Sequence, residues 1–261
     1  RGNRFTIVVR GCCHPDGTPM TDEEAMDEVN RIQDDMEAAL GGHRFPNWIG
    51  PQRFGSGRPV TPHVGRHVVN ENWEEAVMTY LSMEGPNEGE EAQAIRQRIR
   101  ENGIDEALLE DLPRWMGFER RMIEHLLSNP DDHVGAFRKL PTNLQLMTVH
   151  ALQSIVFNKS LQRRLEEGLP LARPVVGDIV GRVDEKSQLD VNSCVVVQER
   201  TLNRISRNCD LGRLMTTGPL PGSEISTSEG EPGQLEQATI EAEGLGDLSW
   251  DVEAVPRLSS K

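Results

Sequence analysis

The sequence holds 261 residues at 29.2 kDa, which is enough for one large domain or two modest ones and too many for a disulfide-dependent miniprotein. Its 28 Lys and Arg residues stand against 42 Asp and Glu residues, so the formal net charge is −14 and the average surface repels polyanions and membranes. No apolar run exceeds four residues, so the sequence predicts no transmembrane helix and no membrane partner.

The cysteines form one adjacent pair and two singles, a spacing typical of neither a disulfide framework nor a zinc motif. This usage suits a reducing compartment, so we expect a cytoplasmic protein. The four residues are Cys12, Cys13, Cys194 and Cys209.

Charge is unevenly placed along the chain. Residues 38–70 contain no Asp or Glu and carry four Arg and three His, and residues 133–165 form a second acid-free stretch with five Lys or Arg. The pattern predicts two positive faces on a negative protein, which would attract phosphates to one cleft while the remaining surface discourages non-specific contacts. The alternative is that these stretches are buried elements or loops in which acids are unwelcome.

The chain opens as a strand would. It begins at Arg1 without a methionine and runs into apolar residues, which predicts a strand over residues 3–10 in a largely buried sheet. It closes at Lys261 with no helix stop and no polar tail. We therefore expect a piece of a longer polypeptide, with part of the chemistry and the partner strands outside it.

A capped helix follows. The Thr21 hydroxyl and the Glu24 carboxylate fit a capping box, in which each satisfies a backbone amide at the helix start. Apolar residues then recur at helical spacing to Leu40, and two glycines from Gly41 predict the end of the helix. With the strand and a Gly/Pro-rich segment to about Arg66, this helix would form one unit.

The next part of the chain reads as helical and charged. Apolar residues at helical spacing predict three helices between residues 70 and 129 and a longer helix from Pro141 to about Glu167.

Two short strands come next. Val-rich runs predict them at 175–183 and 191–197, and a turn-rich loop at 218–233 precedes a last helix at 235–243. The fold class we expect is α+β, in which helices with a small sheet, roughly residues 70–250, are inserted into another domain.

The densest polar segment runs from residue 46 to residue 55. Its glycines would let the backbone approach a ligand closely. Arg53 and the later Arg66 can fork onto phosphates, and Asn47 and Gln52 can donate to and accept from a base edge. This composition suits a loop for a nucleotide or an RNA strand; the alternative is a structural turn with solvated arginines. It is not a P-loop, because no Lys-Ser/Thr pair follows its glycines.

The second segment, residues 140–158, is an ordinary amphipathic helix. Its apolar face predicts core packing by Leu144, Met147, Ala151, Ile155 and Val156. Its polar residues, His150, Gln153 and Asn158, are more typical of hydrogen bonds between helices than of ligands.

Both segments resemble motifs of a known family. Asn-x-x-Gly-x-Gln-Arg-Phe-Gly at 47–55, followed by Gly65-Arg66, resembles a signature of the TruD family of tRNA pseudouridine synthases. Residues 149–158 are similar to that family's later helix motif, and residues 2–5 to its strand preceding the first signature. The three motifs stand in the family's order. Extra helices around 71–129 resemble the enlarged archaeal and eukaryotic members more than the compact bacterial ones.

The resemblance implies a fold and a domain order. Residues 1–67 would be part of a pseudouridine-synthase catalytic domain with an antiparallel sheet, 68–250 a largely helical insertion domain, and 251–261 the return to the catalytic domain.

It also implies a reaction. The family's isomerases convert a uridine of tRNA, position 13 in most members, into pseudouridine without a metal, nucleotide or organic cofactor. An aspartate attacks the nucleoside, the N-glycosidic bond breaks, and the detached uracil rotates and rejoins through carbon 5. The base must first leave the RNA fold for a pocket.

By motif position, the resemblance assigns Asn47 to holding the target uridine. It assigns Gln52, Arg53 and Phe54 to the pocket floor and the RNA path. Four cations would contact RNA phosphates, and these are Arg58, Arg66, Lys159 and Arg163.

The sequence departs from the family pattern at the nucleophile. The family's aspartate lies in a Lys-Asp motif N-terminal to the first strand, so it should precede Arg1, and an aromatic contact would likewise follow Lys261. The aspartates near the start of the chain, Asp16, Asp22, Asp34 and Asp35, sit in no such motif. We therefore expect no catalytic residue within this chain, and no catalysis by it alone.

A second departure concerns an aromatic residue. Family members commonly place an aromatic two residues after the Asn, where this sequence has Ile49, with Trp48 beside it.

Metal sites and other function classes are weaker alternatives. Cys12 and Cys13 would point to opposite faces of a strand, and His63 and His67 lack the intervening Glu of a zinc-protease motif, so we expect no metal. One alternative is a non-catalytic RNA-binding module of the same fold. The other is an acidic helical scaffold whose basic stretches are core.

Overall fold

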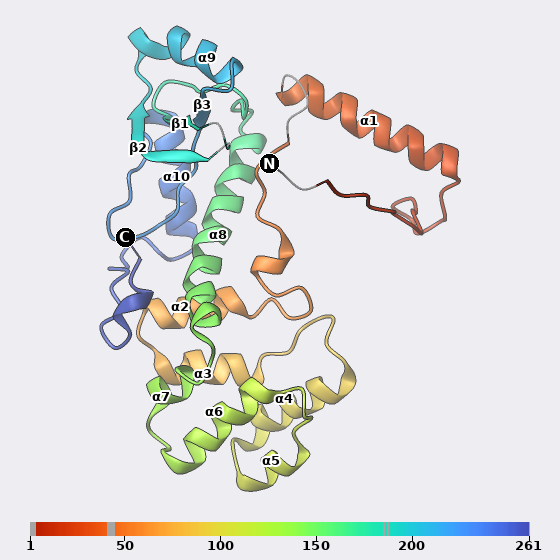
Figure 1. Ribbon diagram of the computed structural model, residues 1–261, viewed down its shortest axis with the longest axis vertical. Helices are drawn as coiled ribbons and strands as arrows, with labels where there is room; N and C mark the ends of the chain where they lie inside the picture. Colours follow the sequence, from red (N-terminus) through yellow and green to blue (C-terminus); the bar gives the residue numbers. More distant parts are fainter. Residues whose placement is uncertain (1–3, 41–44, 185, 187, 261) are drawn as a thin grey trace.

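The structure is a computed structural model and describes residues 4–40, 45–184, 186 and 188–260. It has the expected α+β architecture (Figure 1). A long helix, α8 (Thr142–Glu166), runs through the body, with a cluster of shorter helices at one end and a small sheet at the other. The helices predicted between residues 70 and 129 and from Pro141 are confirmed.

The N-terminal helix α1 (Asp22–Leu40) forms where the capping box predicts it. Glu24 Oε2 accepts from the Thr21 amide at 2.8 Å, and Thr21 Oγ1 accepts from the Glu24 amide at 3.2 Å. The helix stands apart from the body (Figure 1). Met26, Val29 and Ile32 of its apolar stripe are exposed. The glycines expected to end it lie outside the described residues.

The predicted buried strand at 3–10 is wrong for residues 4–10, and residue 3 lies outside the described range. The segment has no strand structure, and Phe5 and Ile7 are 76% and 81% exposed. A strand needs a neighbour that takes up its amides and carbonyls, and within the described residues none pairs with this segment.

The helical cluster contains more helices than the sequence predicted. The segment read as Gly/Pro-rich forms the turn η1 (Pro51–Arg53) and the helix α2 (Thr61–Val69), in which Pro62 occupies the first turn, where its missing N–H costs nothing. The other helices of the cluster are α3 (Trp73–Ser82), α4 (Glu90–Asn102), α5 (Glu106–Asp111), α6 (Gly117–Ser128) and α7 (His133–Phe137).

The sheet is antiparallel, with strand order β2-β1-β3. It consists of β1 (Ile179–Val183), β2 (Leu189–Val196) and β3 (Leu214–Thr216), so both predicted strands are present with shifted ends. The turn η2 (Glu199–Thr201) leads into α9 (Leu202–Asp210), whose Ile205 and Cys209 form a small core with Val180 and Val197. The last helix, α10 (Gly230–Ala242), begins five residues before the predicted start, and the turn η3 (Pro256–Leu258) follows it.

One large core joins the helical cluster, α8 and the C-terminal segment. The C-terminal Val252, Val255 and Leu258 pack into it with Val64 and Val68 of α2. At its centre α2 touches α8 with almost no space between the backbones. A Cβ at Gly65 would lie 2.1 Å from the Thr148 carbonyl oxygen, so only glycine allows this approach.

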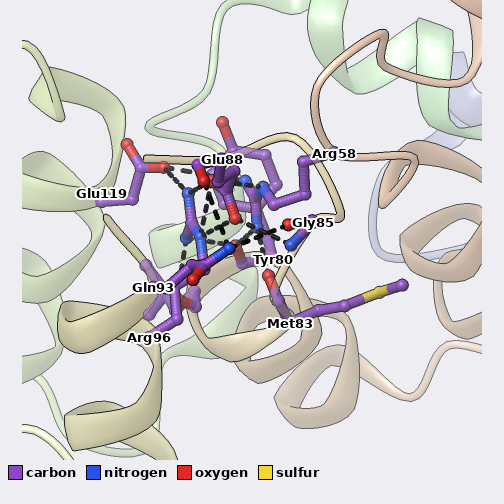
Figure 2. Close-up of polar contacts among 9 residues, drawn as sticks. Arg58, Tyr80, Met83, Gly85, Glu88, Gln93, Arg96 and Glu119 are labelled. Atoms are coloured by element: carbon purple, nitrogen blue, oxygen red, sulfur yellow. Dashed lines mark hydrogen bonds and ion pairs between the residues drawn. The ribbon is translucent and has the colours of Figure 1, made fainter. Parts of the chain in front are cut away.

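A buried ion-pair network holds the segment between η1 and α2 (Figure 2). Arg96, 2% exposed, donates from Nε to Glu88 at 3.0 Å and from Nη2 to Glu119 Oε1 at 3.1 Å. Arg58 donates from Nη1 to the Tyr80 carbonyl oxygen at 2.6 Å, and its Nε lies 3.4 Å from Glu88 Oε1. Two guanidinium groups thus face two carboxylates, which satisfies charges that would be costly to bury alone.

Backbone contacts hold the same segment between η1 and α2. The Asn87 amide donates to the Gly57 carbonyl oxygen at 3.2 Å, and Gly55 adopts a φ of +101°. The polar segment at 46–55 is therefore anchored directly after its last residue.

We predict that Gly65→Ala lowers the free energy of unfolding by about 1–3 kcal/mol, because the added methyl group meets backbone atoms that cannot rotate away. Urea unfolding followed by circular dichroism measures this. Gly117→Ala is the control, since a Cβ there meets nothing within 4 Å. Equal stability of the two variants would contradict the close approach.

We predict that Arg96→Met costs about 3–5 kcal/mol of unfolding free energy, because it leaves Glu88 and Glu119 short of a buried cation. The matched control is Arg100→Met, whose partner Glu84 lies at the surface, and we expect a loss of at most about 1 kcal/mol. A loss for Arg96→Met as small as the control's would show that the network contributes little.

Candidate functional site

The two polar segments singled out in the sequence meet in space. The Ile49 amide donates to Asn158 Oδ1 of α8 at 2.9 Å, and Asn158 Nδ2 donates back to the Ile49 carbonyl oxygen at 2.9 Å. A single amide side chain thus replaces both backbone partners of Ile49, as a neighbouring strand would. This pair fixes the loop before η1 against the middle of the long helix.

A hollow of about 340 Å³ lies beside this joint. Its apolar walls come from α2, α8 and the residue after η1. Its polar lining residues come from both acid-free stretches, together with one carboxylate. The lining residues are Phe54, Pro62, His63, Arg66, Leu152, Ile155, Asn158, Lys159 and Glu243. Its size falls within the range of small-molecule sites.

The residues assigned to the target uridine lie on the loop. Asn47 is exposed, as are Gln52 and Arg53, and Phe54 is half-buried at the hollow. Trp48 is 47% exposed, whereas Ile49 is half-buried with its backbone held by Asn158. Ile49 occupies the position at which family members commonly have an aromatic residue. The exposed aromatic side chain next to Asn47 in this chain is instead that of Trp48.

The four cations assigned to phosphates lie in different surroundings. Arg58 belongs to the buried network and is engaged there. Arg66 and Lys159 both donate to Glu243, which follows α10 and is 12% exposed on its side chain. Arg163, in the last turn of α8, is half-buried and forms no ion pair with the described residues.

Two histidines near the site have lowered pKa values. Burial lowers the pKa of His63, with Arg66 and His67 adding to the effect, and burial together with Arg53 lowers the pKa of His150. Both imidazoles are therefore neutral at neutral pH. The positive field at the loop and the hollow comes from arginine and lysine.

The prediction that the polar residues of the second segment bind other helices is wrong: Gln153 and Asn158 bind loop segments instead. Gln153 donates from Nε2 to the Pro221 carbonyl oxygen at 2.7 Å and to Ser260 Oγ at 2.6 Å, and Asn158 binds the loop as described. His150 is exposed.

Glu243, which was not predicted as a site residue, lines the hollow between Arg66 and Lys159. It lies at the end of a predicted helix in an acid-rich stretch, and nothing in its local pattern marks it. Among the described residues no His, Cys, Asp and Glu side chains cluster as a metal site, and no helix is long and apolar enough to cross a bilayer.

Comparisons with known proteins give one consistent result. The model of the family "tRNA pseudouridine synthase D (TruD)" matches residues 1–261. A protein of Methanosarcina mazei named "Probable tRNA pseudouridine synthase D" is 38% identical over all of this chain and 57% of its own length. One with the same name from Methanopyrus kandleri is 36% identical over 99% of this chain and 54% of its own length.

A solved structure agrees. The crystal structure of the TruD protein of Methanosarcina mazei has a TM-score of 0.84 and 38% identity, over 92% of this chain and 54% of that chain. The chain thus spans little more than half the length of the curated relatives it matches. Because the family model matches residues 1–261, the whole of this chain, the chain belongs to the TruD family.

Proposed function

We propose that the protein containing this chain is a tRNA pseudouridine synthase, an isomerase that converts a uridine of tRNA, at position 13, into pseudouridine. The observation that carries the proposal is the pair of hydrogen bonds between Ile49 and Asn158, which brings two family motifs together at a hollow with one lining carboxylate; the exposed Asn47 lies two residues before Ile49. Residues 109 positions apart in the sequence form this joint.

The proposed reaction needs no external reagent. An aspartate N-terminal to Arg1 attacks the nucleoside and forms a transient bond to it, and the bond between C1′ and N1 of uracil breaks. A bond between C1′ and C5 then forms, and the bond to the aspartate breaks, which restores the free carboxylate. The C5 proton leaves and N1 takes up a proton, so atoms and charge balance. This chain supplies no nucleophile in the proposal; it supplies the surface that receives the extruded base.

Asn47 suits the role of holding uracil. Its amide can accept from a ring N–H and donate to a ring carbonyl, which orients the base without a formal charge. Trp48 offers a stacking surface beside it, and Gln52, Arg53 and Phe54 extend the same loop toward the hollow. The segment from Ile49 to Arg58 is held at both ends, by Asn158 and by the Arg58 network, which limits the ordering that this segment must undergo when RNA binds.

The proposed phosphate contacts are Arg53, Arg66, Lys159 and Arg163. Arg58 is left out of this set because its guanidinium is engaged by Glu88, Glu119 and the Tyr80 carbonyl oxygen. Arg66 and Lys159 can reach a phosphate only by exchanging Glu243 for it, since that carboxylate binds both.

The proposed domain division follows the packing. We place the first boundary before Thr61 rather than at residue 67, because the buried face of α2 belongs to the helical core. Residues 1–60 would then belong to the catalytic domain, with its remaining strands supplied outside this chain. The segment 251–260 packs into the same core and would lead back to the catalytic domain.

The proposal names RNA as the partner and no cofactor, metal or membrane. It places the activity in the cytoplasm, the reducing compartment that the cysteine usage favours.

We predict that Asn47→Ala in the full-length protein lowers kcat by about 100-fold or more while tRNA affinity changes by less than about 3-fold, because an oriented hydrogen bond to the reacting base is lost. Tritium release from C5-labelled uridine in tRNA gives kcat, and filter binding gives Kd. Asn102→Ala, at the exposed end of α4, is the control. Equal losses in turnover and affinity would argue against a role in the pocket.

We predict that the isolated chain, residues 1–261, binds tRNA but releases no tritium above background, because its nucleophile lies outside it. The full-length protein under identical conditions is the positive control. Uridine isomerisation by the chain alone would overturn the placement of the nucleophile.

A further inference from the structure

A second basic surface lies on α9, at the end of the molecule that carries the sheet (Figure 1). Arg200 of η2 and Arg204 and Arg207 of α9 follow one another at spacings of four and three residues, which places them on one face of a continuous helical segment. All three are exposed. We call these three residues the α9 arginine stripe.

The stripe carries uncompensated charge. None of its three guanidinium groups forms an ion pair with a carboxylate in the part of the chain that the structure describes, and Arg200 donates only to the Gln198 side chain, at 2.9 Å. The carboxylate at the end of α9, Asp210, pairs with Arg173 instead.

Packing fixes the direction in which the stripe points. The opposite face of α9 is buried through Ile205 and Cys209 against Val180 and Val197, so the helix cannot turn its arginines inward. Two more exposed arginines adjoin it. Arg213 follows α9, its amide donating to the Asn208 carbonyl oxygen at 2.9 Å, and Arg182 lies on β1 beside the strand that Arg213 enters.

The same long helix supports the stripe and the candidate site. Arg164 in the last turn of α8 donates from Nη1 and Nη2 to the Asp178 carboxylate at 2.6 and 2.7 Å, and Asp178 directly precedes β1. This buried bidentate pair ties the sheet to α8, six residues beyond the Asn158 that holds residues 46–55, which we call the signature loop. At 1.5 Å per residue, the two anchor points are about 9 Å apart along the helix axis.

We propose that the α9 arginine stripe is a second RNA-binding surface, which grips backbone phosphates of the tRNA away from the reacting uridine; this rests on the proposed function. Guanidinium groups bind phosphates through paired N–H donors, and a fixed row of three matches successive phosphates of one strand. The stripe contributes affinity and orientation but touches no reacting atom.

The test compares two triple variants of the full-length protein with equal charge change. The first replaces the stripe by Arg200→Gln, Arg204→Gln and Arg207→Gln, which keeps helix propensity high. The control replaces three exposed cations of the helical cluster that form no ion pair within the described residues, by Arg114→Gln, Arg121→Gln and Lys139→Gln. Circular dichroism checks that both variants fold.

Titration with tRNA at several salt concentrations measures Kd and its salt dependence, and steady-state kinetics measure KM and kcat. We expect the following results. The stripe variant raises Kd and KM by about 10- to 100-fold and lowers the slope of log K against log salt by about 2, since each lost phosphate contact removes about 0.7–0.9. Its kcat at saturating tRNA stays within about 2-fold of the parent. The control variant keeps the parent's slope, Kd and KM.

Three results would overturn the inference. Equal weakening by both variants would assign the effect to net charge, and parent-like binding by the stripe variant would show that RNA does not touch it. Loss of binding to phosphatidylserine vesicles with unchanged tRNA affinity would assign the stripe to a membrane. Failure of the proposed function would give a different result, because the unmodified protein itself would release no tritium from tRNA. The salt dependence of tRNA binding would still show whether RNA contacts the stripe.

Discussion

The close contact between α2 and α8 is the constraint on which the candidate site depends. Because Gly65 has no side chain, the backbone of α2 packs directly on the Thr148 carbonyl, and the chain before α2 is brought alongside about three further turns of α8. Asn158 then reaches the backbone of Ile49 with both ends of its amide. A wider spacing between the helices would remove this joint and the hollow beside it, so local backbone geometry decides where the exposed Asn47 stands.

Charge along the sequence predicted this meeting only in part. The acid-free stretches at 38–70 and 133–165 do lie together, as α2 and α8 and the loop held between them. Yet the absence of acids nearby in sequence does not leave a cation free. Glu88 and Glu119 enclose Arg58 from another part of the fold, and Glu243 binds Arg66 from still farther along the chain. Which carboxylate pairs with which cation depends on how distant segments pack together, and the local composition of the sequence does not predict this.

The elements that sequence reasoning found were those with local causes. The helix from Asp22 begins at a capping box whose partners are three residues apart, and α8 shows its apolar spacing over many turns. Helix α2 was missed because Pro62 and Gly65 usually interrupt helices; one is harmless in the first turn and the other is required by the neighbouring helix. The strand expected at 3–10 depends on partner strands, which no local pattern supplies.

The free cations follow a similar division. Buried arginines are matched by carboxylates, as Arg96 and Arg164 show, because a buried charge without a partner is costly. The three of the α9 stripe are exposed, where water pays that cost and folding exerts no demand for a partner. Their alignment is therefore not required by stability. Because the Arg164–Asp178 pair ties the sheet to α8, an RNA strand held on the stripe would meet the signature loop at a set distance, and RNA shape would decide which uridine reaches Asn47.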